Sequence, residues 1–241
     1  MFSSVFKTIC TLICSLHFLL SPYAHAEDHA NCNLSSWLKP GLLNSTRIEL
    51  KFGSYGVQIL AQDQVSGIRL SSLYSEHGTE KIARTIAFTQ YEANLDDRLK
   101  MAHQKILEGG SIGSTLKKYG FDIKKDILFK GLVEGIPDQL QCLMHTQKHT
   151  FATVIYNLSA KEGNNDYPYC TIAEIYSPEF LTLVEVDQIY PESLPENDFD
   201  AIDIINHIKH VKPNTNHQSL LFEKLCKSSY PITWMINSVA F

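Results

Sequence analysis

The stretch IRLSSLYSEHGTEKIARTIAFTQ, residues 68–90, decides the fold. Residues 68–74 and 82–90 are both rich in apolar, aromatic and β-branched side chains. Between them lies Ser75-Glu76-His77-Gly78, whose composition is typical of a turn. The stretch therefore predicts a β-hairpin.

Each strand of this hairpin carries an arginine. Because side chains alternate along a strand, Arg69 should share a face with Ser71, and Arg84 should share an apolar face with Ile86 and Phe88. Burying an unpaired ion is costly, so each arginine should have a partner or a ligand.

A second hairpin is expected further along the chain. Residues 151–158 and 169–177 are strand-like, and the polar run 162–166 supplies the turn. In the returning strand, Glu174 shares a face with Ile172 and Tyr176. A guanidinium can clamp a carboxylate, and a carboxylate can hold a hydroxyl or move a proton. Arg69, Arg84 and Glu174 together indicate a pocket for a small acidic ring compound.

The remaining patterns set the fold class. Residues 55–61 and 121–129 are further strand candidates, whereas 95–106 and 111–120 have helical spacing and helix-start residues. Strands outnumber helices and no βαβ alternation appears. We therefore expect an α+β fold, with an antiparallel sheet of about five or six strands and helices on one face.

The two ends of the chain differ from its middle. Residues 1–26 have the pattern of a cleavable signal peptide, with Lys7, an apolar run and small residues before a cleavage point near Ala26. Removal would leave 215 residues and change the formal net charge from −5 to −6. We expect a periplasmic or secreted protein with no stable membrane insertion and no nucleic-acid partner. Residues 188–241 read as a C-terminal helical extension that a protein partner could use.

Four cysteines would remain after cleavage: Cys32, Cys142, Cys170 and Cys226. An even number in an exported chain predicts two disulfides, and three pairings are open. No CxxC spacing is present, so neither zinc binding nor thioredoxin-type chemistry is expected.

Four ordered segments between Leu43 and Val186 resemble bacterial chorismate pyruvate-lyase and its wider fold. The first is Leu43-Asn44-Ser45-Thr46. The second is Arg69 with Arg84-Thr85 fifteen residues later. The third is Ser111-Ile112-Gly113-Ser114-Thr115-Leu116, and the last is Ile172-Ala173-Glu174-Ile175-Tyr176-Ser177-Pro178. The resemblance implies a domain over residues 27–187, in which 131–149 is an insertion.

The resemblance also implies roles for single residues. Arg69 matches the arginine that binds the ring carboxylate, and Arg84 matches a second pocket arginine. Glu174 matches the glutamate that contacts the ring hydroxyl and assists the elimination. Thr46 and Ile112 lie where backbone N–H groups hold the carboxylate. The implied reaction releases pyruvate from chorismate and leaves 4-hydroxybenzoate, without metal or cofactor.

Two other functions remain open at this stage. Chorismate is made and used in the cytoplasm, whereas this chain carries an export pattern, so a non-catalytic periplasmic binder of a small aromatic carboxylate is the first alternative. The second is an interaction protein that uses residues 131–149 and the C-terminal extension. In that case Arg84 and Glu174 would pair with each other across a collapsed pocket.

Overall fold

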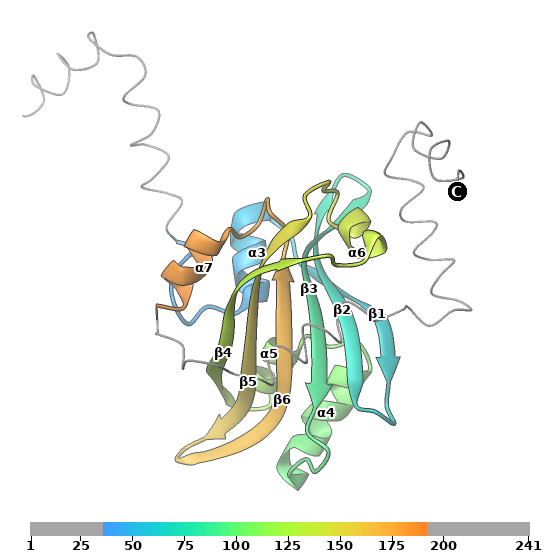
Figure 1. The fold of residues 1–241 in the computed structure, drawn as a ribbon. Coiled ribbons are helices and arrows are strands. Elements are labelled where there is room, and N and C mark those ends of the chain that lie inside the picture. The colour runs from blue at the N-terminus through green and yellow to red at the C-terminus, as the bar shows by residue number, and fades with distance from the viewer. Residues whose placement is uncertain (1–35, 192–241) are drawn as a thin grey trace, which may run out of the picture. The chain divides into compact units, whose positions relative to one another are not determined.

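The computed structural model describes residues 36–191, and the fold below is formed by residues 40–191. Its centre is a six-stranded sheet in the order β1-β2-β3-β6-β5-β4 (Figure 1). Every neighbouring pair is antiparallel. The strands are β1 (Gly56–Asp63), β2 (Ile68–His77), β3 (Glu80–Tyr91), β4 (Asp122–Glu134), β5 (Thr150–Glu162) and β6 (Asn165–Tyr176).

The strand order divides the sheet into two meanders. β1, β2 and β3 follow one another in sequence and in space, and so do β4, β5 and β6. The meanders join through β3 and β6, which pair from Thr85 opposite Tyr176 to Tyr91 opposite Cys170. Both predicted hairpins, and the α+β class with an antiparallel sheet, are therefore confirmed.

Most of the helices of the described chain lie on one face of this sheet. They are α3 (Asn44–Phe52), α4 (Lys100–Leu107), α5 (Ile112–Lys118) and α7 (Leu183–Ile189), with a 3-10 turn at Asp97–Leu99 before α4. Gly53 ends α3 in the left-handed conformation, at φ 79°, which glycine adopts without strain. A reciprocal capping box of Thr182 and Glu185 begins α7.

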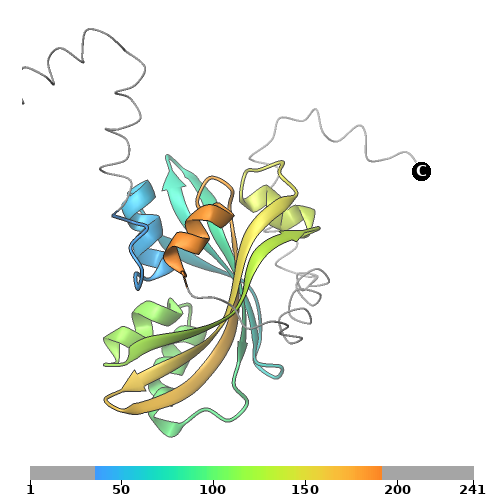
Figure 2. The same ribbon diagram turned by 60° about the vertical axis from the view of Figure 1, so that its left-hand side comes forward.

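The opposite face is covered by α6 (Asp138–Leu143), seen in yellow-green in Figure 2 across the sheet from α3 in blue and α7 in orange. This helix belongs to the segment 131–149, which the sequence predicted to be an irregular insertion. The segment instead completes β4 and supplies α6. Leu140 and Met144 from this region pack with Ile86, Phe88 and Ile175 in the hydrophobic core.

A β-bulge in β3 changes the position of Arg84. Leu73 pairs with Thr85 and Tyr74 pairs with Ala83, so Arg84 is the extra residue on its strand. The expectation that Arg84 shares a face with Ile86 and Phe88 was wrong, because period-2 alternation does not continue through a bulge. Arg84 turns instead toward the side occupied by α3.

The cysteine prediction also needs a correction. Cys170 is free and buried within β6, so it takes part in no disulfide. Its neighbours in the sheet are Tyr91 and Leu158, and a thiol enclosed at this position has no second cysteine to meet. Cys142 lies in α6, whereas Cys32 and Cys226 lie outside the described residues. At most one pair can form among these three.

The proposed signal peptide and almost all of the C-terminal extension also lie outside the described residues. Within residues 36–191, no helix has both the length and the apolar character needed to span a membrane.

Candidate functional site

A cavity of about 60 Å³ lies between the sheet and the beginnings of α3 and α5. This is several times the roughly 10–15 Å³ that one water molecule needs. Every strand contributes to its wall. The lining residues are Leu43, Asn44, Ser45, Tyr55, Val57, Arg69, Ser71, Leu73, Ala87, Thr89, Ser111, Ile112, Gly113, Ile123, Lys125, Tyr156, Leu158, Ile172 and Glu174.

Arg69 reaches the cavity from β2 and is only 1% exposed. Its Nη1 donates to the backbone carbonyls of Ile106, at 2.9 Å, and Gly110, at 3.1 Å, so the end of α4 fixes the guanidinium. Its buried Nε has no hydrogen-bond partner. Arg69 forms no ion pair with a carboxylate in the part of the chain that the structure describes. Arg69 therefore keeps a buried Nε–H donor that no protein atom satisfies.

Glu174 enters the same cavity from β6 and is 4% exposed. One carboxylate oxygen accepts from Asn44 Nδ2 at 3.2 Å, and the other accepts from the Tyr176 hydroxyl at 2.8 Å. Burial, followed by the charge of Glu174, raises the pKa of both Tyr156 and Tyr176 well above the usual value. Both phenols therefore stay protonated and can donate hydrogen bonds.

Lys125 adds a second cation to the cavity wall. Its ammonium lies 4.0 Å from the centre of the Tyr156 ring and 3.3 Å from the Tyr190 hydroxyl. Burial lowers the pKa of Lys125, but Tyr190 and Glu174 raise it by more, so the net direction is upward. Lys125 is therefore charged at neutral pH.

Several other polar atoms around the cavity are buried without a hydrogen-bond partner. They are Asn44 Oδ1, Tyr55 Oη and Thr89 Oγ1, in addition to Arg69 Nε. Buried polar atoms are nearly always paired in folded proteins. Unpaired donors and acceptors around one cavity indicate that a polar molecule, either water or a ligand, binds there.

Two helices begin at this cavity without a side-chain cap. Leu43 precedes α3 and Ser111 precedes α5, and neither side chain accepts a capping hydrogen bond from the first N–H groups of the helix. The first N–H groups of a helix have no partner within the helix, and its N-terminus favours negative charge. Ile112 lines the cavity as the resemblance implied, but Thr46 does not, and Asn44 and Ser45 take its place.

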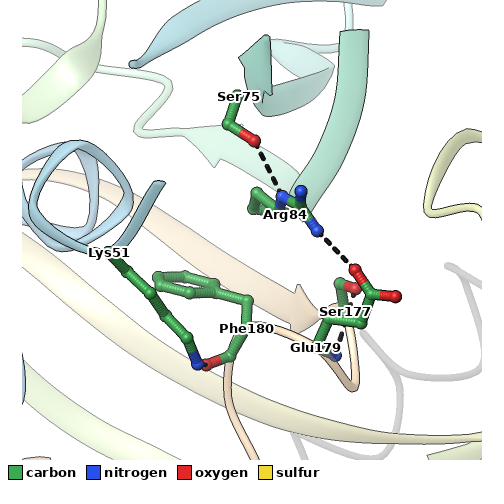
Figure 3. Close-up of polar contacts among 6 residues, drawn as sticks. All are labelled: Lys51, Ser75, Arg84, Ser177, Glu179 and Phe180. Atoms are coloured by element: carbon green, nitrogen blue, oxygen red, sulfur yellow. Dashed lines mark hydrogen bonds and ion pairs between the residues drawn. The ribbon is translucent and has the colours of Figure 1, made fainter. Parts of the chain in front are cut away.

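Arg84 is not among the residues that line the cavity. Its Nε donates to Ser75 Oγ at 2.8 Å, and its Nη1 pairs with Glu179 at 2.7 Å (Figure 3). The guanidinium also stacks on Phe52, 3.8 Å from the ring centre. Arg84 therefore ties β3 to α3 and to the loop after β6; in this structure it does not line the cavity, and its carboxylate partner is Glu179, not Glu174. The bulge described above is the physical reason.

Sequence reasoning missed several residues that line the cavity: Asn44, Ser45, Tyr55, Lys125 and Tyr156. Lys125 could have been found, because alternation from the apolar Ile123 places it on the same face. Asn44 and Tyr55 lie far in sequence from Glu174, and only the folded chain brings them to the same cavity.

No group of three or more His, Cys, Asp or Glu side chains within residues 36–191 is arranged to hold a metal ion. No protein-family model matches this chain, and no curated protein sequence matches it either. Among solved structures, the chain is similar to the crystal structure of PhnF from Mycobacterium smegmatis. The two are 12% identical, the match covers 60% of this chain and 68% of that chain, and the TM-score is 0.39.

Proposed function

We propose that the cavity binds a small organic carboxylate. The observation that carries this proposal is Arg69. It is a buried guanidinium, held in place by two backbone carbonyls, with an unpaired Nε and no carboxylate partner among the described residues. A buried charge without a counter-ion is costly, and a bound carboxylate would remove that cost through a charge-assisted contact.

The balance of charge around the cavity supports an anion. Arg69 and Lys125 contribute positive charge and Glu174 contributes negative charge. Arg47, from α3, is 2% exposed and close enough to Glu174 for that carboxylate to raise its pKa, although burial lowers the pKa more. The positive ends of α3 and α5 add to the same field.

The apolar part of the wall supports a ligand with an apolar body. Apolar side chains of Leu73, Ala87, Leu158 and Ile172 line the cavity together with its polar residues. Small-molecule sites are commonly built in this way, with an apolar wall and a few polar groups that fix orientation. A carboxylate that carries an aromatic or cyclic body would bury that body against these side chains.

A chorismate lyase-like reaction is the first activity to test. In that reaction the ether bond between ring and side chain breaks and the ring loses a proton. The side chain leaves as enolpyruvate, which takes up a proton to become pyruvate. No oxidant is needed, because the ring becomes aromatic as the bond breaks. Arg69 would hold the ring carboxylate, and Glu174 would contact the ring hydroxyl end and assist proton transfer.

One observation favours the alternative of binding without catalysis. Both oxygens of Glu174 already accept hydrogen bonds, from Asn44 and Tyr176. A carboxylate held in this way is well placed to orient its neighbours, and positioning of a bound ligand requires no proton transfer. Turnover and binding without turnover are therefore the two functions to distinguish at this cavity.

The test combines chorismate turnover with ligand titration. Pyruvate release from chorismate is followed with the purified chain and with Glu174→Gln, and 4-hydroxybenzoate is titrated by calorimetry. Pyruvate release that Glu174→Gln abolishes supports the lyase. Heat of binding without pyruvate release supports the binder. If neither chorismate nor 4-hydroxybenzoate interacts, the aromatic carboxylate proposal is rejected.

A further inference from the structure

Lys125 occupies an unusual position for a strand lysine. It lies in β4, two residues after Ile123, and both side chains line the cavity. The neighbouring Lys124 is 48% exposed and pairs with Asp126 and Asp166. β4 thus places one lysine in solvent with two carboxylates, and the next lysine at the cavity with none.

The contacts of Lys125 are with aromatic side chains. Its Nζ lies 4.0 Å from the centre of the Tyr156 ring and 5.7 Å from that of Tyr190, and it donates to the Tyr190 hydroxyl at 3.3 Å. It forms no ion pair with a carboxylate in the described part of the chain. An ammonium has three N–H donors, so this one keeps donors available for a guest.

An ion pair with Glu174 does not explain why the Lys125 ammonium lies at the cavity. The two groups influence each other electrostatically, since Glu174 raises the pKa of Lys125. They are not in ion-pair contact, and the Glu174 oxygens are taken by Asn44 and Tyr176. Two half-satisfied cations, Arg69 and Lys125, therefore face one cavity from different strands.

We propose that Lys125 binds a second acidic group of the ligand, so that the cavity selects cyclic dicarboxylates over monocarboxylates. This inference rests on the proposed carboxylate site and specifies its ligand class. Arg69, from β2, would take one carboxylate, and Lys125, from β4, would take the other. The tyrosine rings beside Lys125 would keep the ammonium in place while its N–H groups turn toward the ligand.

The test compares three probes by calorimetry: benzoate, isophthalate and terephthalate. Each is titrated into the full chain, into Lys125→Met and into Lys124→Met, the exposed control from the adjacent position. The wild type should bind one of the dicarboxylates about tenfold or more tightly than benzoate, as expected for an added charge-assisted contact. Lys125→Met should remove this preference by weakening the preferred dicarboxylate by a larger factor than benzoate, whereas Lys124→Met should keep the preference.

The outcomes separate this inference from the proposed function. If benzoate binds and no dicarboxylate is preferred, or if the preference survives in Lys125→Met, the role of Lys125 is refuted and the carboxylate site stands. If none of the three probes binds the wild type, the carboxylate site and the role of Lys125 are both rejected. A merely structural lysine would weaken all three probes equally and leave their ratio unchanged.

Discussion

Replacement of Arg69 by methionine should separate ligand binding from folding. Arg69→Met removes the charge and the fork of N–H donors but keeps much of the length of the side chain. A hydrogen bond to a charged group contributes about 1.5–3 kcal/mol. Loss of that contact should weaken binding of a small aromatic carboxylate roughly 10- to 150-fold, since about 1.4 kcal/mol corresponds to a factor of ten.

The same substitution should also reduce stability. Nη1 of Arg69 satisfies the carbonyls of Ile106 and Gly110, and methionine leaves both without this donor. The Gly110 carbonyl is only partly buried, so water can replace one bond, and removing a buried charge offsets part of the loss. We expect the free energy of unfolding to fall by about 1–3 kcal/mol, measured by denaturant titration.

Arg84→Met provides the matched control. Arg84 is also buried, at 6% exposed, and it is also fixed by hydrogen bonds, but it lies outside the cavity. This variant should lose stability and keep wild-type affinity in the same calorimetric titration. Unchanged affinity in Arg69→Met, or an equal loss of affinity in Arg84→Met, would refute the assignment of the carboxylate site.

Two further predictions concern stability. Leu140→Ala should lower the free energy of unfolding by about 2–5 kcal/mol, because Leu140 on α6 is 2% exposed and its truncation leaves a cavity in the core. A decrease below about 1 kcal/mol in denaturant titration would show that α6 does not seal that face of the sheet. Burial lowers the pKa of His103 in the folded chain, so the unfolded chain binds the proton more readily. The contribution of His103 to stability should therefore be complete above its pKa in the unfolded chain, about 6.5. Stability should fall as the pH drops from that value toward the pKa in the folded chain. His103→Gln should flatten this pH profile, and an unchanged slope would contradict the interpretation.

The sequence predicted the parts of the fold that depend on local pattern. Alternation and turn residues located both hairpins, and the helical spacing of residues 95–106 and 111–120 separated α4 from α5. Arg69 and Glu174 were recognised because a charge inside an apolar strand is unusual, and the structure brings both to one cavity. These predictions succeed because each uses residues that are neighbours along the chain.

The errors arise where a local rule stops applying. A single extra residue at Arg84 reverses the alternation of side chains between the two faces of the sheet, and no residue type in the sequence of β3 indicates this bulge. Residues 131–149 lack a long apolar stripe, yet α6 needs only a few buried side chains, such as Leu140, to cover the core. Asn44 contributes to the cavity only because α3 packs against the sheet, and sequence alone does not show that contact.

The seam between β3 and β6 has a consequence for how the site is assembled. Arg69 belongs to the meander before the seam, whereas Lys125 and Glu174 belong to the meander after it. A fragment that ends after β3 would carry Arg69 without Lys125 and Glu174, and a fragment that starts before β4 would carry Lys125 and Glu174 without Arg69. Neither piece holds a complete cavity, so ligand affinity in a split version of the chain would report that its two halves had reassociated.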